Sequence, residues 1–275
     1  MKNFNTTAFK LFLPALFLSV IANAQKLPKI QTTSVAVPAN FKVDGKPTEL
    51  DNKFQAFNRT TEVYYTISNS ATKLYLTVQS NERRITKKIM QNGITLTIFA
   101  DPANKNGLAV TFPAYPKTQR PIFLNLRDPY VTMKDTNRNN AMADSVMTGY
   151  NAALNGTFKT INIIGEASIP DSTLSVFNTE GFKAAARFDN KLVYTQEVAI
   201  PLSYLKFAAD KPGTFKYTLQ VNGVPGEVRT VDNGRRMVYT AGDGSEVNIG
   251  YPGPDNLGFA NPTYFSGVYT LAKPQ

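Results

Sequence analysis

From residue 62 onward, short runs of β-branched and aromatic residues alternate with turn residues, and this rhythm constrains the fold more than any other feature of the chain. Within 73–79, Leu74, Leu76 and Val78 alternate with more polar neighbours, which is typical of a strand with one face in a core. Comparable runs lie at 63–67, 94–100, 108–112, 158–164, 184–188, 192–200, 215–221 and 267–271. The spacing predicts an all-β fold, namely an antiparallel β-sandwich of the immunoglobulin-like or jelly-roll-like kind.

Two stretches interrupt this rhythm. Between residues 139 and 155 apolar residues recur at helical spacing, which predicts one inserted α-helix; these residues are Met142, Val146, Met147, Tyr150 and Leu154. Residues 222–267 are rich in Gly and Pro and predict a loop-dominated region with short strands such as 236–240. Because no linker divides the chain, we expect one domain over 39–275, preceded by a leader segment at 25–38.

The N-terminus has the three parts of a secretory signal peptide. Lys2 and Lys10 provide a charged start, an apolar run follows at 11–22, and Ala22-Asn23-Ala24 supplies small residues at a cleavage position. The apolar run is shorter than the about 20 residues that a membrane-spanning helix needs. We therefore expect residues 1–24 to be removed and the mature chain to be exported to the periplasm, the outer surface or the medium, without a transmembrane segment.

The chain contains no His, Cys or Trp. A Ser-His-Asp triad needs an imidazole, a cysteine protease needs a thiolate, and a zinc site needs His or Cys ligands, so these kinds of site are excluded. We predict neither a metal nor another cofactor. Without disulfides, an exported domain of this size depends on its hydrophobic core for stability.

Basic side chains outnumber acidic ones. Lys and Arg total 30 against 20 for Asp and Glu, a formal net charge of +10, and they gather in two runs: Arg83, Arg84, Lys87 and Lys88, then Arg229, Arg235 and Arg236. Such runs attract anionic partners, for example acidic polysaccharide or lipid A phosphate. The alternative interpretation is a solvated charged loop. The export pattern and the lack of a recognition motif argue against nucleic acid as a partner.

Five segments follow the order of a known family: FKVDGKP at 41–47, KLYLTV at 73–78, GITLTI at 93–98 with Phe112-Pro113 after it, GFKAAARF at 181–188, and YTQEVAIPL at 194–202. They resemble the family 9 carbohydrate-binding modules and the DOMON-like superfamily. This resemblance implies an antiparallel β-sandwich that binds sugars without cleaving them. Sugar-binding members hold the ligand between Trp side chains and haem-binding members use Met and His as ligands, whereas this chain has neither Trp nor His.

Sugar recognition needs an aromatic surface for the ring and polar groups for its hydroxyls. Five residues of the predicted strands supply both if the polar strand faces meet in one groove: Tyr64, Tyr75, Gln79, Arg187 and Glu197. Two alternatives stay open. The aromatic side chains can instead fill the core, and Arg187 can form a structural ion pair with Glu197 across neighbouring strands.

These observations predict an exported, non-catalytic binding module whose ligand is a carbohydrate, either a polysaccharide or an oligosaccharide. The first alternative is a structural or assembly protein of the cell envelope that binds another protein. The second is a carboxylate-dependent glycosidase or lyase that uses Glu197. Such an enzyme needs two acidic side chains flanking the scissile bond, and no spacing in the sequence singles out a pair.

Overall fold

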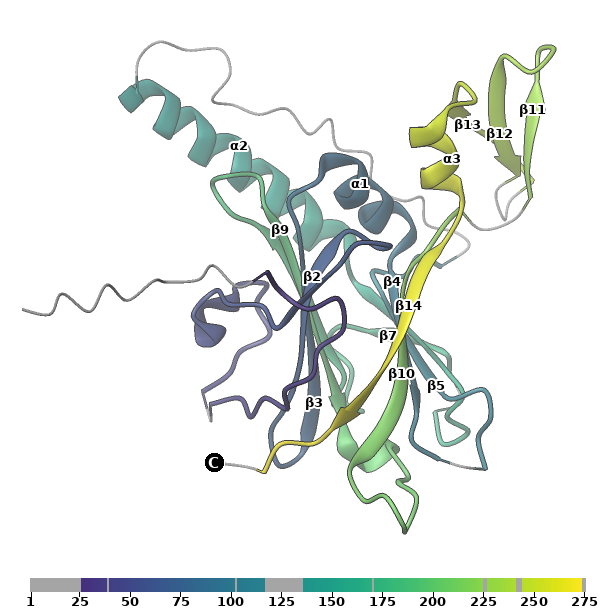
Figure 1. The fold of residues 1–275 in the computed structure, drawn as a ribbon. Coiled ribbons are helices and arrows are strands. Elements are labelled where there is room, and N and C mark those ends of the chain that lie inside the picture. Colours follow the sequence, from purple (N-terminus) through teal and green to yellow (C-terminus); the bar gives the residue numbers. More distant parts are fainter. Residues whose placement is uncertain are drawn as a thin grey trace, which may run out of the picture.

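The computed structural model describes residues 26–38, 40–101, 103–116, 136–169, 171–224, 227–240 and 244–273. Two antiparallel sheets stack on each other, and a third, smaller sheet forms a lobe beside them (Figure 1). Sheet A has the strand order β1-β2-β3-β9-β8, and sheet B has the order β14-β10-β4-β5-β6-β7. The all-β antiparallel sandwich predicted from the sequence is confirmed. The predicted signal peptide at 1–24 lies outside the described residues.

Most strands are short, and a helix follows or precedes several of them. Sheet A contains β1 (Ala56–Asn58), β2 (Val63–Asn69), β3 (Lys73–Ser80), β9 (Tyr194–Pro201) and β8 (Lys183–Phe188). Sheet B contains β14 (Thr263–Thr270), β10 (Thr214–Val221), β4 (Ile94–Phe99), β5 (Leu108–Phe112), β6 (Thr160–Ile164) and β7 (Thr173–Ser175). The third sheet contains β11 (Val228–Val231), β12 (Arg236–Thr240) and β13 (Glu246–Gly250). The helices are α1 (Arg83–Asn92), α2 (Thr136–Thr157) and α3 (Pro254–Ala260), with 3-10 turns at Pro47–Leu50 and Leu202–Tyr204.

The main core lies between the inner faces of sheets A and B. Because side chains alternate along a strand, β2 directs Val63, Tyr65 and Ile67 inward, and all three are buried. From the opposite sheet, β10 contributes Tyr217, whose hydroxyl lies 3.0 Å from the hydroxyl of Tyr65. Burying a phenol costs little when its hydroxyl is hydrogen-bonded. This pair therefore joins the two sheets without leaving a polar atom unpaired.

The helices differ from the sequence prediction in number. The predicted helix at 139–155 is α2, which extends over 136–157. The basic run that begins at Arg83 is not a charged loop but helix α1, and the predicted loop-rich region at 222–267 contains β11, β12, β13 and α3. No helix among the described residues is long and apolar enough to cross a membrane.

Residues 26–38, which the sequence predicts as a leader, pack along the edge of sheet A. The side-chain amide of Gln31 pairs with the main chain of Ile67 as a neighbouring strand would: its Oε1 accepts from the Ile67 N–H and its Nε2 donates to the Ile67 carbonyl, both at 2.7 Å. Further along, the Asn69 N–H donates to the Val35 carbonyl, and the Val37 N–H donates to the Asn69 carbonyl. This segment therefore continues the edge of the sheet beyond β1.

Residues 40–55, which we call the N-terminal strap, cross the outer face of sheet A on the left of Figure 1. At one end of the strap, Phe41 packs on Tyr75 with ring centroids 4.6 Å apart. At the other end, the Gln55 N–H donates to Thr66 Oγ1 at 3.1 Å. Part of the outer face of sheet A is therefore covered by the protein's own chain.

Candidate functional site

All five residues predicted to bind a ligand lie on the outer face of sheet A. Strand pairing aligns four residues across β2, β3, β9 and β8 in one row: Tyr64, Gln79, Thr195 and Arg187. Glu197 and Tyr75 occupy the next two rows. The register thus brings the predicted residues together on one face, although the N-terminal strap shares that face.

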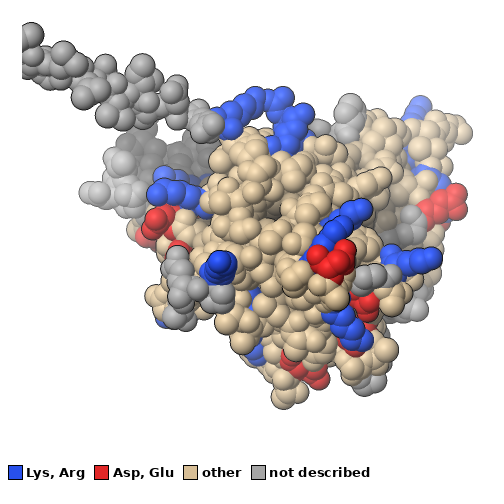
Figure 2. All heavy atoms as spheres, turned by 60° about the horizontal axis from the view of Figure 1, so that its bottom comes forward, with Lys and Arg blue, Asp and Glu red and all other residues tan. Residues whose placement is uncertain are grey.

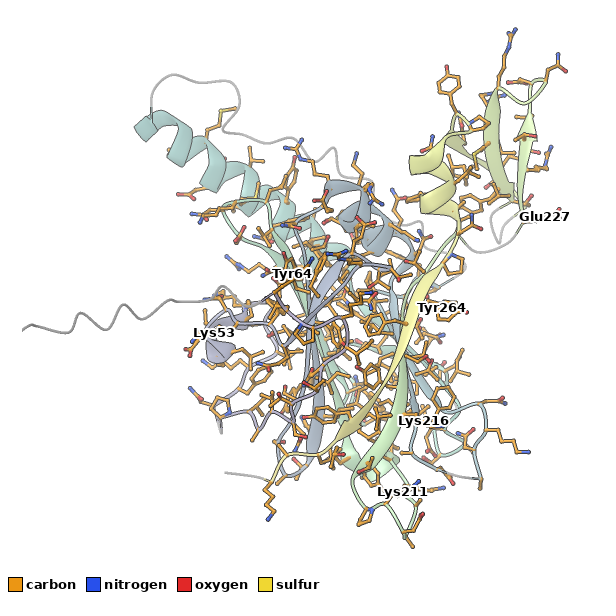
Figure 3. The ribbon with its side chains drawn as sticks, viewed as in Figure 1. Lys53, Tyr64, Lys211, Lys216, Glu227 and Tyr264 are labelled. Atoms are coloured by element: carbon orange, nitrogen blue, oxygen red, sulfur yellow. The ribbon has the colours of Figure 1, made fainter. Side chains whose placement is uncertain are left out.

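The two tyrosines are engaged by aromatic residues of the N-terminal part of the chain. Tyr75 contacts Phe41, and the ring of Tyr64, labelled in Figure 3, lies 6.1 Å from that of Phe54 and 4.6 Å from that of Phe57. A hollow of about 440 Å³ remains beside Tyr75, lined in part by Lys73 and Lys183. Both tyrosines therefore serve packing, as the core-filling alternative expects, but on the outer face of the sheet.

Gln79 and Arg187 do not converge on Glu197. Gln79 donates from Nε2 to Thr195 Oγ1 at 3.1 Å. The register places Ala185, not Arg187, opposite Glu197, and the described residues show no ion pair between Arg187 and Glu197. Arg187 is exposed to solvent. The predicted ion pair between these two residues is wrong, because the pairing offsets them by one row.

Glu197 lies beneath the strap and is 1% exposed. Its Oε2 accepts from the Asp44 N–H at 3.0 Å and from the Gly45 N–H at 2.9 Å, while its Oε1 has no hydrogen-bond partner among the described residues. Burial raises the pKa of this carboxyl to about 7, and the two N–H groups oppose that rise. The carboxyl group thus fastens the strap to sheet A.

Gly45 allows this contact. Its φ of +77° lies in the left-handed region, which favours glycine. A Cβ at this position would lie 2.8 Å from the main-chain nitrogen of Arg187. Only a residue without a side chain lets the turn approach β8 closely enough to direct two N–H groups at Glu197.

A cavity of about 600 Å³ lies elsewhere, between α1 and the lobe formed by the third sheet and α3. In Figure 1, α1 and α3 lie on neighbouring parts of the upper surface, and the two helices are in contact. We call this cavity the basic cleft. Its volume is within the range of small-molecule and sugar sites.

Helix α1 forms the basic wall of the cleft. Arg83, Arg84, Lys87 and Lys88 line the cavity, spaced one and four residues apart, which places them on one side of a helix. The other side of α1 buries Ile89 and Met90 in the main core. On the face seen in Figure 2, by contrast, charged side chains are scattered over a mainly uncharged surface.

Lys88 holds the lobe to the body of the domain. It is 2% exposed, and its Nζ donates to the carbonyl of Gly258 at 2.8 Å and to that of Asn261. These carbonyls lie at the C-terminal end of α3, where a cation is favoured. Burial, with a smaller contribution from Arg84, lowers the pKa of Lys88 to about 8.

The lobe supplies an apolar and amide-bearing wall. Tyr239, Val247, Ile249 and Phe259 line this side together with Asn248 and Asn256. The described residues that line the cleft include no carboxylate, but Arg84 pairs with the carboxylate of Glu62, so the charge of Arg84 is already partly neutralised. A cavity with cations on one side and apolar and aromatic side chains on the other fits an anionic ligand that also has an apolar face.

A smaller cavity, of about 310 Å³, brings together two carboxylates, Asp101 and Glu166. Hydrogen bonds from the Ser168 hydroxyl and N–H lower the pKa of Glu166. A glycosidase acid needs a raised pKa, so this pair is poorly suited to that chemistry. Among the described residues there is also no group of three or more acidic side chains that could hold a metal ion.

Sequence reasoning identified the cations of the basic cleft but not its apolar wall. Helix α1 was not predicted from the sequence; the four-residue spacing of Ile85 and Ile89 is the signal that could have indicated it. The lobe residues are distant in sequence from α1, and no local pattern joins them to it. Comparison with known proteins gives no assignment: no protein-family model matches the chain, and no curated protein matches it.

Proposed function

We propose that this protein is an exported, non-catalytic binding module whose ligand is an anionic carbohydrate held in the basic cleft. The observation that carries the proposal is the pairing of a cationic helix face with an apolar, aromatic wall across one cavity. Export is supported by the signal-peptide pattern of residues 1–24.

The two walls suit the two sides of a sugar acid. The apolar face of a sugar ring packs against aromatic side chains such as Phe259, while a carboxylate or sulfate group pairs with a cation such as Lys87. The amides of Asn248 and Asn256 offer donors and acceptors for ring hydroxyls. The outer face of sheet A is a weaker choice, because the N-terminal strap occupies it.

The test is calorimetric titration with polygalacturonate and with neutral dextran, in low and high salt. We expect the acidic polymer alone to bind, and more weakly as salt rises. Lys87→Glu should weaken binding about tenfold or more, since a charge-assisted hydrogen bond is worth roughly 1.5–3 kcal/mol. The matched control is Lys216→Glu, an exposed lysine on the outer face of sheet B, labelled in Figure 3.

The hollow beside Tyr75 is an alternative binding site in the same molecule. Lys73→Glu makes the same change of charge in that hollow as Lys87→Glu makes in the basic cleft. Loss of binding in Lys73→Glu but not in Lys87→Glu would show that the ligand binds in the hollow on sheet A. This result would contradict the proposal that it binds in the basic cleft. Equal binding of dextran and polygalacturonate would contradict an anionic ligand.

A further inference from the structure

Strand β14 is a long, uncharged edge of sheet B. The other outer strands of the two large sheets are β1 and β7, of three residues each, and β8, which carries Lys183 and Arg187. Strand β14 has eight residues and none is charged. Proteins commonly protect sheet edges by shortness or by charge, and β14 has neither.

Elsewhere in the sandwich, side-chain amides cover exposed strand edges. Asn151 of α2 accepts from the Phe188 N–H at 2.7 Å and donates to the Phe188 carbonyl at 3.0 Å, at the free edge of β8. Gln31 covers Ile67 on β2 in the same way. These contacts show what satisfied edges look like in this protein.

Among the residues that the structure describes, the free edge of β14 is covered only at its C-terminal end. The Leu271 N–H donates to the Gly213 carbonyl, so by alternation the odd-numbered residues of β14 face β10 and the even-numbered ones face outward. The outward Thr270 carbonyl accepts from Ser34, and the main chain of Ala272 bonds to the Asn69 side chain. Among the described residues, no hydrogen bond reaches the outward main-chain groups at positions 264, 266 and 268.

The same stretch exposes two large apolar side chains. Tyr264 is 61% exposed and Val268 is 55% exposed, and Figure 3 shows Tyr264 pointing away from the strand. They flank Ser266 symmetrically, two residues to either side, on the same face of sheet B. An added strand would satisfy the main chain and cover these side chains together.

We propose that β14 pairs antiparallel with β14 of a second copy of this chain, with Ser266 on the two-fold axis. In this register Ser266 of one copy lies opposite Ser266 of the other, and Tyr264 lies opposite Val268 of the other copy. All these residues direct their main-chain groups outward, so each opposed pair exchanges two hydrogen bonds. The aromatic and β-branched side chains also form a favourable cross-strand pair.

A second copy fits this edge because the edge is complementary to itself. The strand has no charge, so two-fold pairing brings no like charges together. Each Tyr264 meets Val268 of the other copy. A shift of the register by one residue would oppose main-chain groups that point to the free edge to main-chain groups that already bond to β10. Two-fold pairing of one surface with itself is the commonest symmetry of protein dimers.

Sedimentation velocity of the chain without residues 1–24, over a dilution series, tests the proposal. The mass should rise toward that of two chains with concentration. Ser266→Pro removes one outward N–H and Ser266→Lys places two cations on the axis; neither breaks a main-chain bond to β10, so both should stay monomeric. Thr97→Lys, on the same sheet face but two strands from the edge, should dimerise as the wild type does.

Cross-linking locates the contact, since the chain has no cysteine of its own. Ser266→Cys treated with a short bismaleimide should give a product of twice the chain mass. Ser175→Cys, on the β7 edge, should give none. A single-chain mass at every concentration, a dimer that persists in both Ser266 variants, or cross-linking at 175 but not at 266 would overturn the proposal.

Discussion

At the scale of single residues, the carboxyl group of Glu197 holds the N-terminal strap to sheet A, although this residue was predicted to bind a ligand. Two main-chain N–H groups of the strap converge on its Oε2, and the acidic neighbours Asp44 and Glu49 raise the pKa beyond the effect of burial. A buried carboxylate that lacks a cationic partner is costly when ionised. Protonation of Glu197 therefore removes the cost of burying its charge, and the surrounding pH controls that protonation.

Stability should depend on the protonation of Glu197. Because its folded-state pKa, about 7, exceeds the ordinary value of 4.5, the folded state favours the proton. The resulting stabilisation is complete below the ordinary value and is lost as the pH rises through the folded value. Glu197→Gln lacks this titration and should gain up to about 3 kcal/mol over the wild type between about pH 5 and about pH 8. Urea unfolding at both pH values measures this, and parallel pH profiles would contradict it.

Two glycines provide a matched pair. Gly45→Ala should destabilise the fold by roughly 1–3 kcal/mol, because its backbone is left-handed and a Cβ meets the main chain of β8. Gly149, inside α2, has no atom within 4 Å of a built Cβ. Gly149→Ala should therefore stabilise by up to about 1 kcal/mol. Thermal unfolding of both variants tests the contrast, and a change of the same sign in both would count against it.

At the scale of elements, one side of α1 packs in the main core and the other side lines the basic cleft. Ile85, Ile89 and Met90 are buried in the main core, which holds the helix in place, so that the basic residues of its other side face the cleft. Lys88 connects this helix to the end of α3. The geometry of the cleft thus depends on one buried ammonium group between two helices.

Removing that ammonium group should loosen the lobe. Lys88→Met keeps the aliphatic chain but leaves the carbonyls of Gly258 and Asn261 without their donor, at a cost of about 1–3 kcal/mol. Hydrogen exchange of peptides covering 254–261 should become faster. Lys87→Met, one residue away and exposed, should change stability by less than about 0.5 kcal/mol. Unchanged exchange in Lys88→Met would show that the lobe is held by other contacts.

At the scale of the whole molecule, the N-terminal residues complete the sandwich. Gln31 and residues 35–37 extend one edge of sheet A, and the hydroxyl of Tyr269 on β14 donates to the Val35 carbonyl at 3.2 Å. The segment therefore bridges the two sheets where their edge strands approach. This contact closes the gap between the sheets at the C-terminal end of β14, while the main-chain edge of β14 at 264–268 stays open to an added strand.

A chain that starts at residue 39, the domain start expected from the sequence, should be less stable than one that starts at residue 25. It loses the amide pair on Ile67 and the bonds at Asn69, and unpaired buried main-chain groups cost roughly 1–3 kcal/mol each. Urea unfolding of the two chains compares them directly. Equal midpoints would show that residues 26–38 contribute only surface contacts.

The strands were predictable because local alternation encodes them, whereas α1 was hidden by its basic residues. For β14, the sequence predicted a strand at 267–271, but the structure begins it at Thr263, since the pairing with β10 and not the local composition sets its start. For the predicted site, side-chain alternation placed Tyr64 and Tyr75 on the polar faces of their strands, and the structure has both on the outer face of sheet A. The contact of Glu197 with Asp44 and Gly45 joins residues more than 150 positions apart, and no pattern in either segment predicts it.

By itself, the sequence determined the antiparallel sandwich, the position of α2 and the absence of His- or Cys-based chemistry, because these follow from local periodicity and from composition. Only the tertiary structure decided which polar surface stays open. The strap covers the part of the outer face of sheet A around Glu197, while the packing of α1 against the lobe leaves a basic cleft. Both outcomes depend on contacts between distant segments, and such contacts arise from complementary shape and hydrogen bonding that one-dimensional patterns do not contain.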